Sequence, residues 1–136
     1  MKAMPQIQKF MTPNPHTIGH DLPLRTALSL MREHRIRHLP VQNGGKLVGM
    51  LTDRDIKLAG SFSDSSNLKV EEVMSPEVFT VTPDSPVDRV VNEMASRKYG
   101  SAVVQQENGK VVGIFTAVDG LHFLGETLQS FYRGRE

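Results

Sequence analysis

The chain of 136 residues lacks cysteine altogether, and its charge is balanced, because 16 lysines and arginines stand against 15 aspartates and glutamates. Without cysteine there is no disulfide scaffold and no thiolate chemistry. The balanced charge argues against a dedicated polyanion binder, which would show a strong basic excess. No run approaches the roughly 18 apolar residues of a membrane span, and the N-terminus lacks the apolar stretch of a signal peptide. These absences predict a soluble, cytoplasmic protein with no membrane partner.

The usual signatures of catalysis are missing as well. The sequence contains neither a Gly-x-Ser-x-Gly turn nor a Walker phosphate loop, and the segment 44–46 is interpreted as a hairpin turn. The adjacent carboxylates of Glu71 and Glu72 fall in a segment that leads into a strand and not in an expected cleft. We therefore expect a binding protein and not an enzyme.

The sequence does contain an internal repeat of one unit. The two copies are offset by 63 residues, and the offset becomes 64 after residue 46. The offset pairs Ile7 with Val70, Met11 with Met74, Thr17 with Thr80, Asp21 with Asp84, Pro23 with Pro86, Thr52 with Thr116 and Asp55 with Asp119. Repeats of about 60 residues are marginal alone, so the two are expected to form one compact domain. Paired copies enclose clefts between equivalent edges, which favours a binding module.

Each repeat predicts the order strand, helix, strand, strand, helix. Short strands are expected near 17–18 and 79–81, after Met-x-Pro segments that favour extended backbone. A helix then begins at a proline, and its apolar residues recur with helical spacing at positions 24, 27, 28 and 31 and again at 87, 90, 91 and 94. Hairpins are expected to turn at Asn43-Gly44 and Asn108-Gly109, where positive φ is tolerated, and second helices to begin near 53–55 and 118–119.

We expect the first repeat at residues 1–60, a polar linker at 61–69, the second repeat at 70–124 and a helical tail at 125–136. The linker has little to bury and is expected to be a flexible connector. An apolar stripe runs into the tail and consists of Leu121, Leu124, Leu128 and Phe131. Two interpretations of this stripe stay open: it covers the core of the same molecule, or it contacts a second copy.

The strongest local signal is the pattern Gly-apolar-apolar-Thr-x-x-Asp, which occurs at Gly49–Asp55 and Gly113–Asp119. Each copy places a threonine, and an aspartate three residues later, where a strand runs into a helix. In the structural interpretation the threonine caps the helix and the acid reaches back to the backbone of the cap. In the functional interpretation the carboxylate accepts hydrogen bonds from a ribose diol while backbone N–H groups face an anion. The two are compatible, because the cap orients the aspartate.

Together, the two repeats, their Met-x-Pro lead-ins, the strand His38–Val41 and the two Gly-to-Asp segments resemble a CBS-domain pair, also called a Bateman module. The resemblance covers about residues 7–124. It implies an α+β fold in which two tandem βαββα repeats pack as a pseudo-two-fold disc with two clefts. In that family the clefts commonly bind AMP, ADP, ATP or S-adenosylmethionine, with or without magnesium, and discs often form homodimers.

The resemblance also assigns ligand-binding positions, residue by residue. They are Thr17, Ile18, Arg37, His38, Thr52 and Asp55 in the first repeat, and Thr80, Val81, Gly100, Ser101, Thr116 and Asp119 in the second. In each set the first pair lines the adenine with backbone groups, the second pair faces the ligand and often its phosphates, and the last pair holds the ribose.

The two repeats differ in charge at the phosphate-facing positions. Arg37 and His38, with Arg35 and Arg54 nearby, supply cations, whereas the equivalent pair at 100–101 is small and uncharged. One cleft is therefore expected to favour nucleotides. The other is expected to be weak, empty or selective for an uncharged adenosyl group.

Histidines at i, i+4 spacing, His16 with His20 and His34 with His38, have the spacing of a helical metal chelate. No acidic or cysteine partner completes either set in the sequence, so we predict no metal site. His38 is instead interpreted as a ligand-facing or solvated residue.

The sequence thus predicts a stand-alone regulatory module in which an adenosyl ligand shifts a dimer or partner-protein equilibrium. The first alternative is a structural module with vestigial clefts that dimerises through its tail. The second is nucleic-acid binding through the basic residues 32–38, which the charge balance disfavours. The start at Met1 and the polar end predict a complete protein and not a regulatory domain cut from a larger enzyme.

Overall fold

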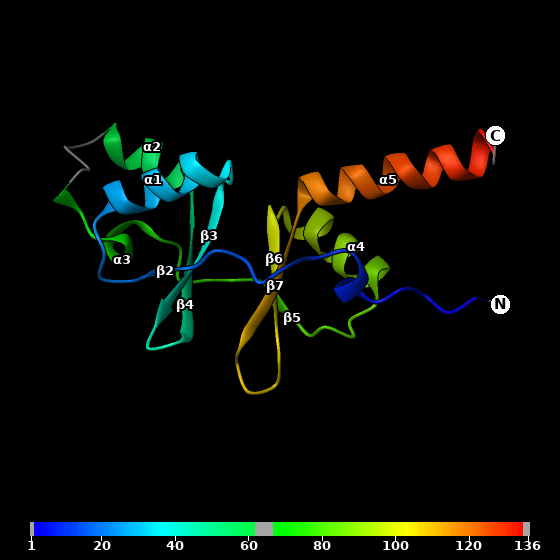
Figure 1. Ribbon diagram of the computed structural model, residues 1–136, viewed down its shortest axis with the longest axis horizontal. Helices are drawn as coiled ribbons and strands as arrows, with labels where there is room; N and C mark the ends of the chain where they lie inside the picture. The colour runs from blue at the N-terminus through cyan, green and yellow to red at the C-terminus, as the bar shows by residue number, and fades with distance from the viewer. Residues whose placement is uncertain (1, 62–66, 135–136) are drawn as a thin grey trace. The chain divides into compact units, whose positions relative to one another are not determined.

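The computed structural model describes residues 2–61 and 67–134 (Figure 1). Within these residues the chain divides into two compact units. Unit 1 comprises residues 2–14, 79–107 and 112–134, and unit 2 comprises residues 15–61, 67–78 and 108–111. Both units contain the strand, helix, strand, strand, helix order that the repeat predicts, which confirms the α+β class.

Unit 2 is built on a three-stranded sheet with the order β2-β3-β4. β2 (Ile18–Gly19) runs parallel to β3 (His38–Asn43), which pairs antiparallel with β4 (Lys46–Thr52). Helices α1 (Leu24–His34), α2 (Asp53–Gly60) and α3 (Val70–Val73) complete the unit. Its core is formed by the buried side chains of Ile18, Leu24, Ala27, Met31, Leu39, Val41, Leu51, Ile56 and Val70.

Unit 1 is built on a four-stranded sheet with the order β1-β7-β6-β5. β1 (Thr12–Pro13) is antiparallel to β7 (Val111–Thr116), and β5 (Thr80–Val81) is parallel to β6 (Ser101–Gln105). The unit also contains the short 3-10 helix η1 (Ile7–Lys9) and the helices α4 (Val87–Arg97) and α5 (Ala117–Tyr132). Its core consists of Ile7, Val87, Val90, Met94, Ala102, Val104 and Phe115.

The first helix of each repeat forms as predicted, with a shift of one residue at its start. Pro23 and Pro86 lie at the N-caps, in extended conformation, and not at the first helical position. Both helices end at a residue with a left-handed backbone, Arg35 with φ 55° and Lys98 with φ 60°. The predicted apolar stripes face the two cores, and three of the four residues in each stripe are buried: Leu24, Ala27 and Met31 in α1, and Val87, Val90 and Met94 in α4.

The hairpin turns are also close to the prediction. In the first hairpin the left-handed residues are Gly44 and Gly45, with φ of 59° and 81°, so the turn lies one residue later than expected and Asn43 ends β3. In the second hairpin Gly109 has φ 86°, and the side-chain oxygen of Asn108 accepts a hydrogen bond from the Lys110 backbone N–H at 3.0 Å.

The lead-in segment of each repeat packs on the hairpin of the opposite repeat. In unit 1, Thr12 pairs with Ile114 of β7. In unit 2, Ser75 and Met50 exchange two backbone hydrogen bonds of 2.9 Å. The compact units therefore do not coincide with the sequence repeats, because each unit contains the lead-in segment of the other repeat.

Two of the segments expected from the sequence are the linker and the C-terminal tail. The tail expected at 125–136 is not separate, since α5 continues without a break from residue 117 to residue 132. The linker expected at 61–69 lies in large part outside the described residues. None of the described helices has the length and apolar character to span a membrane.

Candidate functional site

Each unit has one position at which the last strand of its hairpin turns directly into a helix. In unit 2, Thr52 ends β4 and is the N-cap of α2. In unit 1, Thr116 ends β7 and is the N-cap of α5. Both threonines have extended backbone, which points the side-chain oxygen back at the first helical turn. The duplicated sequence pattern therefore builds the same local structure twice.

A complete capping box forms at both positions. The backbone N–H of Asp55 donates to the Thr52 hydroxyl at 3.1 Å, and the Thr52 N–H donates to Oδ2 of Asp55 at 2.9 Å. The corresponding distances between Thr116 and Asp119 are 3.2 Å and 2.8 Å. The structural interpretation of the motif is confirmed. The second carboxylate oxygen, Oδ1, takes no part in either box.

In unit 2 the arginine-histidine pair assigned from the sequence lies beside the capping box. His38 is the register partner of Thr52 across the β3–β4 pair. The backbone N–H of Asp53 donates to the carbonyl of Arg37 at 3.1 Å, which ties the start of β3 to the start of α2. Ile18 pairs with Val41, three residues further along β3. The six assigned residues of this unit therefore lie at β2, at the start of β3 and at the junction of β4 with α2, around one sheet.

Unit 1 repeats this arrangement at its own assigned residues. The backbone N–H of Ala117 donates to the carbonyl of Gly100 at 3.0 Å, in the place of the Asp53–Arg37 bond of unit 2. Thr80 pairs with Val103 of β6, and the Val103 N–H donates to the carbonyl of Phe79 at 2.9 Å. The backbone scaffold is thus the same in both units.

The two scaffolds carry different side chains. In unit 2 the cations of Arg37 and Arg54 are exposed beside the capping box. Oδ2 of Asp53 lies 4.0 Å from Nζ of Lys57 in the next helical turn. In unit 1 the equivalents of 37, 38, 53 and 54 are Gly100, Ser101, Ala117 and Val118, none of which is charged. The two units therefore have matching backbone at these positions and differ there in the charge of their side chains.

An aromatic pair next to the unit 1 site was missed from the sequence. The rings of Phe79 and Tyr99 stack with their centroids 4.9 Å apart, and these residues immediately precede Thr80 and Gly100. Aligning the repeats would have shown that the pair flanks two assigned positions. The equivalent positions in unit 2 hold His16 and Ile36.

The histidines do not use the i, i+4 spacing considered for a metal. The rings of His16 and His34 stack with their centroids 3.7 Å apart. Nδ1 of His20 lies 2.5 Å from Oε2 of Glu71. This acidic partner of His20 could not be predicted from the sequence, because Glu71 comes from the other lead-in, 51 residues away. Among residues 2–61 and 67–134, no three metal-ligating side chains gather in one place.

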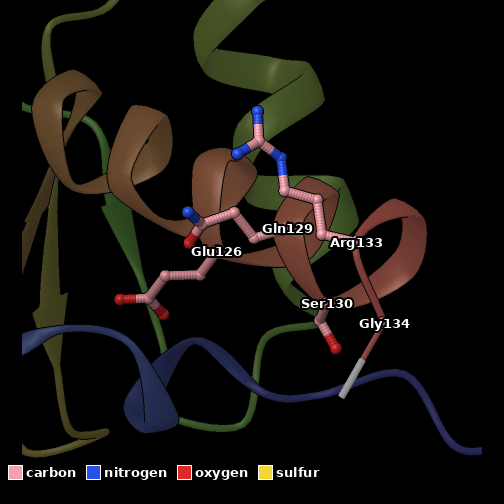
Figure 2. Close-up of a pocket in the computed structure, with 5 residues that line it drawn as sticks. All are labelled: Glu126, Gln129, Ser130, Arg133 and Gly134. Carbon is pink, nitrogen blue, oxygen red and sulfur yellow. The ribbon is translucent and has the colours of Figure 1, made fainter. Parts of the chain in front are cut away.

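A surface hollow lies along the C-terminal half of α5 and is lined by Glu126, Gln129, Ser130, Arg133 and Gly134. Figure 2 shows that the polar side chains point in different directions and do not converge on a common point. None of the twelve assigned residues lines this hollow. It is therefore not a candidate for the ligand site.

Comparison with known proteins identifies the class. The family model described as CBS domain matches the chain twice, at residues 7–61 and 70–126. The chain therefore belongs to the CBS-domain family and contains a pair of CBS domains. This confirms the resemblance on which the site assignment rests.

The relatives include short proteins and long enzymes. A CBS domain-containing protein of Dictyostelium discoideum is 30% identical over 135 residues, which cover 90% of this chain and 93% of that protein. Inosine-5′-monophosphate dehydrogenase of Korarchaeum cryptofilum is 33% identical over 118 residues, 87% of this chain but 24% of the enzyme. The chain spans less than a quarter of the length of the first curated enzymes that it matches, so the match does not extend to most of their length.

Solved structures share the fold over nearly the whole chain. An acetoin utilization protein (AcuB) from Vibrio cholerae matches with a TM-score of 0.85 and 27% identity, covering 98% of this chain and 100% of that one. The CBS domain pair of protein MJ0100, solved with 5′-methylthioadenosine and S-adenosyl-L-methionine, matches with a TM-score of 0.82 and 28% identity, covering 92% and 99%. The predicted fold of two βαββα repeats is confirmed.

Proposed function

We propose that this chain is a regulatory module that senses an adenosine-containing ligand through the Thr–Asp pair of one or both units. The observation that carries the proposal is the duplicated capping box, which holds an aspartate rigidly at the end of a sheet and leaves Oδ1 outside the box. The complex of the MJ0100 CBS pair with two adenosyl compounds supports this ligand class.

The geometry of the box is compatible with ribose binding. A carboxylate has about four acceptor positions, and the box uses one of them, on Oδ2. The free positions of Asp55 or Asp119 can accept hydrogen bonds from the 2′- and 3′-hydroxyls of a ribose. Since the bond to the threonine N–H fixes the carboxylate in advance, little side-chain freedom is lost when the ligand binds.

The adenine is proposed to lie along β2 in unit 2 and along β5 in unit 1, at Thr17-Ile18 and Thr80-Val81. Each of these strands is at the edge of its sheet. An edge strand keeps one row of backbone N–H and C=O groups unpaired within the sheet. These groups match the donors and acceptors on the edge of an adenine ring.

The two sites are proposed to differ in the ligand tail. In unit 2, Arg37 and Arg54 favour the phosphates of AMP, ADP or ATP, with or without magnesium. In unit 1 the small and uncharged Gly100 and Ser101 offer no partner to a phosphate and favour a neutral adenosyl group. The Phe79–Tyr99 stack beside that site adds apolar surface.

Regulation would follow from linkage, because a ligand that binds one arrangement of the protein more tightly shifts the population toward it. We propose a cytoplasmic homodimer that acts on a regulated partner protein and has no catalytic activity of its own. A structural module without a ligand is the alternative, and the exposed apolar residues of α5 favour it.

Thermal melting in the presence of AMP, ADP, ATP, S-adenosylmethionine and adenosine, each with and without magnesium, tests the proposal. Binding to the folded state adds RT ln(1 + [L]/Kd) to the free energy of unfolding, so a true ligand raises the melting temperature in a concentration-dependent way. Guanosine nucleotides at the same concentrations are the matched control. A flat response to every adenosyl compound would favour the structural alternative.

A further inference from the structure

A contact between His20 and Glu71 joins the two sequence repeats within unit 2. Nδ1 of His20, in the turn after β2, lies 2.5 Å from Oε2 of Glu71 in α3. His20 belongs to the first repeat, whereas Glu71 belongs to the lead-in of the second. The side chains are partly shielded from solvent, with exposed fractions of 28% and 39%. We call this contact the His20–Glu71 clasp.

The backbone hydrogen bonds around the clasp are the same in both units. The N–H of Glu71 donates to the carbonyl of His20 at 2.9 Å. In unit 1 the N–H of Gln8, the counterpart of Glu71, donates to the carbonyl of Pro83, the counterpart of His20, at 3.1 Å. Two further backbone bonds recur with the offset of 63 residues: Val70–Leu22 with Ile7–Ser85, and Leu24–Leu68 with Val87–Pro5. Each lead-in therefore docks on its unit through the same backbone contacts.

The side chains at these equivalent positions differ between the units. Proline has no backbone N–H and no ionisable group, and glutamine carries no charge. His20 of unit 2, in contrast, donates its backbone N–H to the carbonyl of Gln42 in β3 at 3.0 Å and turns its ring to Glu71. The clasp is therefore an ionisable contact of unit 2 on a backbone that both units share.

The strength of the clasp depends on the charge of the imidazole ring. A carboxylate only accepts hydrogen bonds, so Nδ1 of His20 carries the hydrogen that it donates to Glu71. When Nε2 is protonated as well, the ring is a cation, and a charge-assisted bond is about twice as strong as a neutral one. Histidine rings ordinarily lose this charge between about pH 5 and 8, whereas glutamates keep theirs above about pH 5. The clasp is therefore strongest at about pH 5–6 and weakens as the pH rises.

The other charged side chains of the elements around the clasp are of types that keep their charge between about pH 6 and 8.5. They are Asp21 in the same turn, Arg25 of α1, Lys46 at the start of β4, Asp53 and Lys57 of α2, and Lys69 and Glu72 at α3. Two of the acids have contacts of their own, since Glu72 accepts from the Lys69 N–H at 2.9 Å and Asp53 lies 4.0 Å from Lys57. The stacked rings of His16 and His34 pair with each other. Between pH 6 and 8.5, the clasp therefore changes charge through its own histidine.

We infer that the His20–Glu71 clasp is a pH-sensitive device that holds the second lead-in on unit 2 and has no counterpart in unit 1. Because His20 directly follows β2, which is only two residues long, the clasp also steadies the strand next to Thr17 and Ile18. A rise in pH then loosens the proposed adenine-lining strand of unit 2 and leaves that of unit 1 unchanged. This effect on the ligand site rests on the proposed function, whereas the clasp itself does not.

Amide hydrogen exchange without nucleotide, resolved by NMR at about pH 6 and pH 8.5, tests the inference. Protection factors remove the intrinsic effect of pH on exchange. In the wild type we expect the protection of the Glu71 amide to fall about two- to fivefold at the higher pH, the range for a partly exposed ion pair. The protection of the equivalent Gln8 amide is expected to stay constant. In Glu71→Gln, which gives unit 2 the uncharged side chain found in unit 1, the fall at residue 71 is expected to disappear.

The matched control is His34→Gln, which removes another histidine of unit 2, exposed in α1, and leaves the clasp intact. It is expected to retain the pH dependence of the wild type. The inference is overturned by protection of the Glu71 amide that does not change with pH, by an equal fall at Gln8, or by a fall that persists in Glu71→Gln. Because no nucleotide is present, these outcomes leave the ligand proposal untouched, and the melting experiment tests that proposal separately.

Discussion

Asp55 and Asp119 each hold a helix start with one carboxylate oxygen, and the other oxygen is the one proposed to bind a ligand. Substitution by asparagine separates these tasks, because its carbonyl oxygen can still accept from the threonine N–H while its NH₂ group cannot accept from a ribose hydroxyl. Alanine removes both. The two substitutions therefore distinguish a loss of stability from a loss of binding.

We predict that Asp119→Ala lowers the free energy of unfolding by about 1 kcal/mol, the usual contribution of a helix cap. Asp119→Asn should lie within a few tenths of a kcal/mol of the wild type, because the bond that now measures 2.8 Å is retained. Urea unfolding without nucleotide measures both values. Equal destabilisation by the two variants would contradict the assigned role of the box.

Two glycines are required by the methionines of the lead-ins. A Cβ at Gly113 would collide with the thioether of Met11, and a Cβ at Gly49 would collide with that of Met74 and lie 2.8 Å from the carbonyl oxygen of Ser75. A flexible thioether can move aside more easily than a backbone carbonyl. Gly49 is therefore the more demanding of the two positions.

We predict that Gly49→Ala and Gly113→Ala both destabilise the protein by about 1–3 kcal/mol, with the larger loss at Gly49. The matched control is Gly125→Ala in α5, where an added methyl group meets nothing within 4 Å and helix propensity should stabilise the chain by up to about 1 kcal/mol. Thermal unfolding of the three variants gives the order of their stabilities. A neutral Gly49→Ala would contradict the packing of Met74.

At the scale of single elements, the hydrophobic spacing predicted α1 and α4 well because each stripe extends over about two helical turns. Errors at the ends were small and local: the prolines cap the helices and do not begin them, and the first hairpin turns at Gly44 and Gly45. The exposed apolar face of α5 could be predicted as a stripe, but the sequence could not show which side of the helix would be covered.

The start of β3 and its counterpart in β6 share backbone geometry and differ in charge, which leads to a test of the proposed phosphate site. We predict that Arg37→Gln weakens binding of ATP several-fold and leaves binding of adenosine unchanged, because only the phosphates meet the guanidinium. The control in unit 1 is Ser101→Gln, at the uncharged counterpart of His38 and one residue after the counterpart of Arg37. Fluorescence or calorimetric titration measures the affinity of each variant for ATP and for adenosine.

An equal loss for ATP and adenosine in Arg37→Gln would contradict the phosphate assignment and indicate a general disturbance of the site. High salt offers a second check, because a phosphate contact weakens with ionic strength and an adenine contact does not.

For the whole molecule, the sequence predicted the duplication, the α+β class and the positions of both Thr–Asp pairs, because each depends on local patterns. It did not predict that the lead-ins are exchanged between the units. The segments involved are short, with β1 only two residues long, so they carry no periodic pattern. Their placement depends on long-range pairing, such as Thr12 with Ile114, which one sequence cannot reveal.

The exchange has a measurable consequence. Ile7 is fully buried in the unit 1 core although it begins the first repeat, and Val70 is fully buried in the unit 2 core although it begins the second. We predict that Ile7→Ala lowers the free energy of unfolding by about 2–5 kcal/mol and increases the rate of amide hydrogen exchange first in β6 and β7.

Val70→Ala is the matched variant and should increase exchange first in β3 and β4. It removes two methyl groups, so its cost should be smaller than that of Ile7→Ala. Faster exchange of β3 and β4 in Ile7→Ala would show that each lead-in belongs to its own repeat.

The central claim is that the free oxygens of Asp55 and Asp119 bind the ribose of an adenosyl ligand. Its most direct test is isothermal titration calorimetry of the compound that gives the largest melting shift, with the wild type, Asp55→Asn, Asp119→Asn and the double variant. The account predicts that one single variant, or each for its own site, loses about 1.5–3 kcal/mol of binding free energy, roughly tenfold to 150-fold in affinity, and that the double variant retains no site of wild-type affinity. Affinity unchanged in the double variant, with its capping boxes intact, would contradict the claim.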